Sequence, residues 1–175
     1  MNTLSSYHNF LKDLATRHKS ILHTEEEKHF ARLNLSKHPI IGAEDLREFF
    51  TSQAKQLKPP FVLSSAPEYQ NQNNEDNPQR TIMGEFFIMG LAPQGDYQLK
   101  QSVMEEMQEI AEDFVAEMIL YYKNNEEEGK PDFSSINIEF VNNVTTKAYC
   151  GAKCYFTILA DANGKYVNKS SKFND

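Results

Sequence analysis

Glycine, cysteine and tryptophan are scarce in this chain. Among 175 residues it has seven glycines, two cysteines and no tryptophan. The glycines form neither a phosphate-binding loop nor a dinucleotide fingerprint, which need several glycines at fixed spacing. An apolar run of about 18 residues and a charged-then-apolar signal pattern are also missing, and these mark membrane-spanning and exported chains. We therefore expect a protein that is made in the cytoplasm, crosses no membrane and binds no cofactor.

Positive charge is also in short supply. The formal net charge is −7 and the sequence pI is about 5.3. General nucleic-acid binding needs a basic surface that neutralises phosphates, so we expect no nucleic-acid specificity. Residues 96–128 include ten acidic and two basic residues, a net charge of −8, so this one segment accounts for the whole excess. It is either a solvated helix surface or a surface that attracts a basic partner in an assembly.

The two cysteines, Cys150 and Cys154, are four positions apart. In a strand they lie on the same face but roughly 13 Å apart, at 3.3 Å per residue. A disulfide needs Cα atoms within about 7 Å of each other. We therefore expect two reduced thiols, as in a protein made in the cytosol.

The segment from Asp96 to about Asn124 is the strongest helical pattern in the chain. Gly95 breaks the preceding segment, and the Asp96 carboxylate can cap the first turn. No glycine or proline follows until after residue 124, and apolar residues recur three and four positions apart. They are Met104, Met107, Ala111, Phe114, Met118 and Tyr121. This spacing predicts one long amphipathic helix over 97–123, spanning roughly 42 Å.

Two shorter helices are expected before it. Apolar residues from Tyr7 to Leu22 repeat at helical spacing, and Ser5 or Ser6 can cap this first helix. The pair Thr24 and Glu27 forms a capping box, which predicts a turn or short helix that brings Phe30 and Leu33 inward. A second helical pattern covers residues 43–57 and ends at Pro59-Pro60.

Four strands complete the pattern. Residues 61–69 and 80–91 predict a hairpin, with the polar stretch 70–79 at its tip and Gly84 as a possible bulge. Residues 136–140 and 148–160 predict a second hairpin. In its last strand, one face carries Cys150, Ala152, Cys154, Phe156 and Ile158, and the other face carries Tyr149, Lys153, Tyr155 and Thr157.

The predicted fold class is therefore α+β: a mostly antiparallel four-stranded sheet of two hairpins, packed by one long helix, with additional N-terminal helices. Residues 1–160 have the size of a single domain. Residues 161–175 are polar and are expected to form a flexible tail.

No pattern of residues predicts catalysis. There is no Gly-x-Ser-x-Gly motif and no histidine placed to pair with a cysteine. All five histidines lie between His8 and His38, and the spacing of His18, His23 and His29 does not suit one helical face, so we expect no metal site. The acidic residues of the long helix could hold a cation, but a solvated face predicts the same residues.

With no pattern for catalysis or metal binding, the sequence favours a protein whose surfaces contact other molecules. We expect three regions to contact other molecules: the polar loop, the acidic face of the long helix, and the outer face of the second hairpin together with the sheet edges. The residues are Gln70, Asn73, Glu75, Asp76, Glu105, Glu109, Glu112, Tyr149 and Tyr155.

The order helical start, hairpin with a long polar loop, long helix, hairpin and polar tail resembles tail-terminator and neck proteins. These are head–tail joining proteins of long-tailed bacteriophages, prophages and related contractile injection systems. His23-Thr24-Glu25 followed by Phe30-Ala31-Arg32 is similar to the opening of structural proteins from phages and prophages. The resemblance implies a homo-oligomeric ring, typically a hexamer, in a virion or injection particle. Its partners would be itself, tail-tube proteins and head–tail connector proteins. The helix expected at 43–57 departs from the family pattern.

Two other functions fit the same sequence. A cytosolic protein-binding or adaptor module of this fold would be a monomer or dimer. A small enzyme would have a concave pocket with perturbed carboxylates or histidines, for instance near His23 and Glu27.

Overall fold

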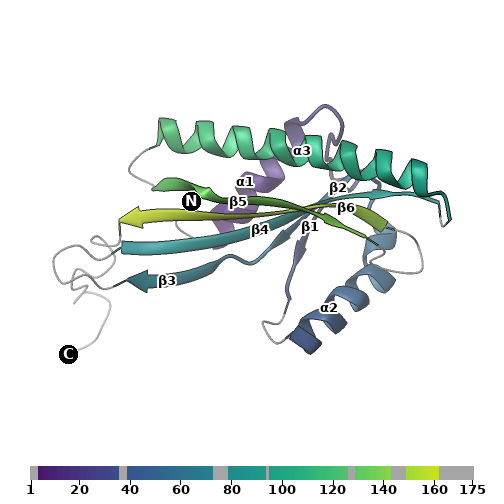
Figure 1. The fold of residues 1–175 in the computed structure, drawn as a ribbon, viewed down its shortest axis with the longest axis horizontal. Helices are drawn as coiled ribbons and strands as arrows, with labels where there is room; N and C mark the ends of the chain where they lie inside the picture. The colour runs from purple at the N-terminus through teal and green to yellow at the C-terminus, as the bar shows by residue number, and fades with distance from the viewer. Residues whose placement is uncertain are drawn as a thin grey trace.

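The computed structural model describes residues 4–35, 39–72, 79–93, 95–125, 129–142 and 149–161. Helices and strands alternate along the chain in an α+β order (Figure 1). The elements are α1 (Leu4–Arg17), β1 (Phe30–Leu33), α2 (Pro39–Ser52), the 3₁₀ turn η1 (Ala54–Gln56), β2 (Phe61–Ser65), β3 (Glu68–Gln72), β4 (Gln79–Leu91), α3 (Tyr97–Asn124), β5 (Lys130–Val141) and β6 (Tyr149–Asp161).

The strands form one mixed sheet of six strands in the order β1-β2-β4-β6-β5, with β3 pairing with β4 beyond β2. Among the described strands, β1 and β2 form the one parallel pair, and the other four pairs are antiparallel. The α+β class is therefore confirmed, whereas the predicted four-stranded sheet is wrong in detail. The expected strand 61–69 bends at Ala66-Pro67 into β2 and β3, both of which pair with β4 as predicted. The second hairpin, β5 with β6, is also confirmed.

Strand β1 is the element that the sequence pattern missed. Thr24 accepts a hydrogen bond from the Glu27 backbone N–H at 2.8 Å, as in a capping box, but no helix follows. Instead the chain turns and enters β1, in which Phe30 pairs with Val62 and Leu33 with Ser65. Four residues are too few to show a period, so only pairing with β2 makes this segment a strand.

Helix α3 confirms the long-helix prediction. Asp96 caps it by accepting a hydrogen bond from the Leu99 N–H at 2.9 Å. With α1, it covers one face of the sheet and buries the main core, in which Phe114 contacts Phe86 with ring centroids 5.7 Å apart (Figure 1). The buried residues of α3 are Met107, Ile110, Ala111, Phe114, Met118 and Tyr122. Tyr122 is buried where the spacing predicted Tyr121.

Helix α2 covers one end of the opposite sheet face and builds a second core. Its members are Leu33, Phe49, Phe50, Ala54, Leu57, Phe61, Leu63, Phe87, Met89 and Tyr149. The helix begins at Pro39 rather than at residue 43. Proline suits a first helical position because the N–H it lacks would have no partner there.

Three local predictions can be corrected or confirmed. Ser5 and Ser6 lie inside α1 and do not precede it. Gly84 is no bulge, because β4 and β6 pair without interruption from Gln79 with Asp161 to Leu91 with Tyr149. Both cysteines are free and buried, as expected.

Residues 162–175 of the expected tail lie outside the described residues. In the described part of the chain, no helix is long and apolar enough to cross a membrane.

Candidate functional site

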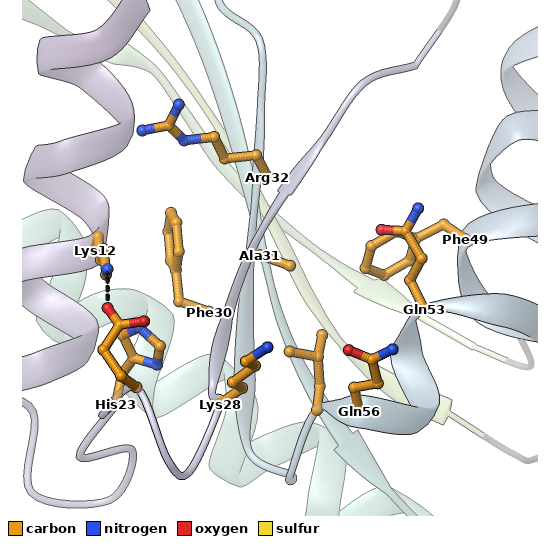
Figure 2. A pocket seen from close by; sticks show the side chains of 11 residues that line it. Lys12, His23, Lys28, Phe30, Ala31, Arg32, Phe49, Gln53 and Gln56 are labelled. Atoms are coloured by element: carbon orange, nitrogen blue, oxygen red, sulfur yellow. Dashed lines mark hydrogen bonds and ion pairs between the residues drawn. The ribbon is translucent and has the colours of Figure 1, made fainter.

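A cleft of about 530 Å³ lies along β1, between α1 and α2. Figure 2 shows β1 running down the middle, with Lys12 of α1 on one side and Phe49, Gln53 and Gln56 from the α2–η1 region on the other. The connection from α1 to β1 closes the lower end with His23 and Lys28 and also contributes Glu25 to the lining. The cleft exists because β1 is the last strand of the sheet and the two helices pack on opposite faces of that sheet.

The cleft is basic although the whole chain is acidic. Of the described residues that line it, Lys12, Lys28 and Arg32 are basic, and Glu25 is the one carboxylate. Lys12 donates to Glu25 Oε1 at 2.8 Å. This hydrogen bond lowers the pKa of Glu25, which is therefore ionised at neutral pH and holds no proton to donate. The Arg32 guanidinium donates to Asn9 Oδ1 at 3.3 Å, and no carboxylate of the described residues forms an ion pair with it.

His23 is buried at the lower end of the cleft. Its Nδ1 accepts a hydrogen bond from the His29 backbone N–H at 3.1 Å, and His29 Nδ1 donates to the Pro60 carbonyl at 2.8 Å. Burial lowers the pKa of His23, and the charge of Lys12 lowers it further. The ring is therefore neutral at neutral pH, and it holds the start of β1 in place by accepting from the backbone.

The other described histidines also have structural partners. His8 Nδ1 and Ser64 Oγ are 2.6 Å apart in the buried layer between α1 and β2. His18 Nε2 lies 3.2 Å from Asp113 Oδ2 and so connects the end of α1 to α3. Glu27, expected near an enzymatic pocket, pairs with Lys58 outside the cleft. Among the described residues, no group of three or more histidine, cysteine, aspartate or glutamate side chains could hold a metal ion.

The predicted interaction residues are spread over three places. Gln70 lies exposed on β3, whereas Asn73, Glu75 and Asp76 lie outside the described residues. Glu105, Glu109 and Glu112 are exposed on α3, as expected of an acidic face. None of the described residues of this set lines the cleft.

The two tyrosines of β6 differ in exposure. Tyr155 is half-buried on the open sheet face, where Lys153 Nζ lies 4.1 Å from its ring centroid and 2.7 Å from Glu85 Oε2. Tyr149 was expected on this outer surface, and that expectation is wrong, because its side chain is only 4 % exposed. Helix α2 covers this end of the face and packs Phe50 against Tyr149, with ring centroids 5.2 Å apart.

The basic residues of the cleft were not recognised from the sequence. Lys28 and Arg32 flank His29-Phe30-Ala31, which makes residues 28–32 a short basic segment in an acidic chain. This signal indicates a binding cleft only when residues 30–33 are known to form an edge strand. Lys12 comes from a separate helix, and no spacing rule connects it to β1.

Comparison with known proteins adds no assignment. No protein-family model matches the chain, and no curated protein matches it. The functional proposals therefore depend on the surfaces of this chain.

Proposed function

We propose that this chain is a non-enzymatic structural subunit that assembles with copies of itself into a closed ring, in the manner of the tail-terminator and neck proteins that it resembles in layout. The observation that carries the proposal is a pair of open sheet edges on opposite sides of the sheet. Strand β5 ends the sheet on one side; the other side is bordered by β1 and, beyond the bend that follows β2, by β3, and the proposed contact uses β5 and β3 (Figure 1). Neither edge pairs with a further strand among the described residues.

An edge strand exposes unpaired N–H and C=O groups that a neighbouring strand can satisfy. Because β5 and β3 are unlike edges on opposite sides of the sheet, pairing β5 of one copy with β3 of the next is a head-to-tail contact. Such contacts generate rings when the rotation between subunits closes. The predicted contact residue Gln70 lies on β3.

Exposed aromatic side chains on β5 support the same contact. Phe133 is 59 % exposed and Phe140 is 55 % exposed. Large apolar side chains on an open edge strand are typical of an interface, since they otherwise promote uncontrolled aggregation. The exposed carboxylates of α3, Glu105, Glu109 and Glu112, offer a surface to a basic partner, for which tail-tube and connector proteins are the candidates implied by the resemblance.

Light scattering at several protein concentrations tests this proposal. The monomer has a mass of 20.2 kDa. We expect a larger mass that persists on dilution, about six times the monomer for a hexamer. Phe140→Asp, which places a charge on the β5 edge, should reduce the mass to that of the monomer. Ile40→Asp is the matched control, because Ile40 is 67 % exposed and belongs to α2 rather than to β5 or β3.

Circular dichroism of both variants shows whether they fold. A monomer at every concentration overturns self-assembly, and a large mass that survives Phe140→Asp overturns the β5 contact. The alternative of a protein-binding module is favoured by a different observation, the basic cleft beside β1.

A further inference from the structure

The centre of the cleft is an open strand edge. Within the described parts of the chain, β1 pairs with β2 on one side and with no strand on the other, and the Val62 N–H donates to the His29 carbonyl at 2.8 Å. Peptide groups alternate in direction along a strand. The N–H and C=O groups of Phe30 and Arg32 therefore point away from β2, toward the open side where the cleft lies.

The walls suit a strand rather than a compact ligand. On one side of β1 are Phe30 and Lys12 of α1, and on the other side are Ala31 and Phe49 (Figure 2). An extended peptide that pairs with β1 would direct alternate side chains to these two sides. Each side offers an apolar contact, so both sets of alternate residues can be recognised.

The charged side chains of the cleft favour a peptide with acidic residues. Lys28 and Arg32 have no ion-pair partner among the described residues, and Lys12 shares the one carboxylate of the cleft, Glu25. The neutral ring of His23 adds no charge. This local positive excess in a chain of net charge −7 complements carboxylates, which form short charge-assisted hydrogen bonds with lysine and arginine.

We propose that the cleft at β1 binds an extended acidic segment of a different protein, which adds to the sheet as a strand beside Phe30–Leu33 and places its carboxylates on Lys28 and Arg32. This site is separate from the proposed ring contact, which uses β5 and β3. It would give each subunit of a ring its own attachment point for a partner's extended arm.

Fluorescence anisotropy with a labelled peptide tests the proposal. The probe has about six residues, matching a short strand, and alternates glutamate with valine. We expect saturable binding to the full chain that weakens as salt is raised. A lysine–valine peptide of the same length should not bind. The double variant Lys28→Glu/Arg32→Glu should lose about tenfold or more in affinity. Lys123→Glu/Lys19→Glu makes the same charge change on exposed residues outside the cleft and should bind like the parent chain.

N-methylated probes separate strand addition from simple charge attraction. Methylating the alternate amides that face β1 removes N–H groups that the Phe30 and Arg32 carbonyls need, whereas methylating the other amides does not. We expect one methylation pattern to abolish binding and the shifted pattern to preserve it. Equal effects of the two patterns, binding of the lysine probe, or no binding up to about 1 mM of protein each overturn the proposal.

A second copy of the chain is the competing occupant. If the unlabelled protein displaces the probe as its own concentration rises, the cleft holds another copy, and the proposed foreign partner is wrong. Repeating the titration with Phe140→Asp keeps the two proposals distinguishable. If that variant still binds the probe, the cleft binds without the ring contact. Failure of one proposal therefore does not imply failure of the other.

Discussion

Gly84 is a position where a single methyl group should destabilise the whole domain. It lies in β4 opposite Phe156 of β6. A Cβ atom at residue 84 would lie 2.3 Å from Phe156 Cζ, far inside van der Waals contact. The ring cannot easily retreat, because the rings of Tyr7 and Phe86 lie 6.0 and 6.3 Å from it in the main core.

Two opposing effects set the size of the change in Gly84→Ala. Overpacking a filled core costs about 1–3 kcal/mol. Replacing glycine lowers the entropy of the unfolded chain, which stabilises the fold by about 0.4–1 kcal/mol. We expect the overpacking to dominate, with a net loss of roughly 1–2 kcal/mol in the free energy of unfolding. In a domain of this size, each kcal/mol lowers the melting temperature by about 2–4 °C.

Urea unfolding followed by circular dichroism measures this loss, since the chain has no tryptophan to report by fluorescence. Phe156→Leu shortens the opposing side chain, so Gly84→Ala should cost at least about 0.5 kcal/mol less in that background. Gly151→Ala should cost more stability than Gly84→Ala, because its Cβ would lie 2.0 Å from the Ile88 carbonyl oxygen and the backbone cannot move aside as an aromatic ring can. If Gly84→Ala is neutral, or costs the same with leucine at 156, the contact with Phe156 does not explain the glycine.

Three further outcomes are expected. Asp96→Ala should lower the free energy of unfolding by about 1 kcal/mol in urea titrations, whereas Asp96→Asn, which keeps an oxygen for the first turn of α3, should lose much less. Burial holds the pKa values of His8 and His23 below the ordinary 6.5 in the folded protein. The unfolded chain therefore binds their protons first, so the free energy of unfolding should fall as pH drops through 6.5, by at most about 1.4 kcal/mol per pH unit for each histidine. Unfolding curves measured between neutral and mildly acidic pH check this. A His8→Asn variant with the same pH slope would refute the role of His8. Burial also raises the pKa of the Cys154 thiol to about 12 and that of Cys150 in the same direction. A disulfide reagent should therefore react with both cysteines only after urea unfolding, and prompt reaction of the native protein would contradict their burial.

The elements that could be read from the sequence share one property, a long and uniform period. The spacing of apolar residues predicted α3 over nearly its whole length, together with its cap at Asp96. Alternation in β6 correctly assigned Cys150 and Cys154 to the buried face. In each case neighbouring residues along the chain determine which side of the element is apolar, so no distant contact is needed to recognise it.

The sequence predictions that the structure contradicts also share a property, their dependence on distant contacts. Strand β1 is too short to show a period, and its strand character comes from pairing with β2, about 30 residues further along the chain. Tyr149 looked like an outward-facing residue of β6, because nothing in β6 reveals that α2 covers that end of the sheet. The bulge expected at Gly84 depended on the glycine alone, whereas the structure shows that the opposing Phe156 requires it.

The sequence by itself determined the type and the buried face of the long elements, the class α+β, and the reduced state of two distant thiols. Only the tertiary structure decided which strands lie at the sheet edges and that Lys12, Lys28 and Arg32 meet beside one of them. The physical reason is the range of the interactions. Helical and strand periods arise from residues a few positions apart, whereas an edge and a cleft arise from packing between segments that are far apart in the sequence.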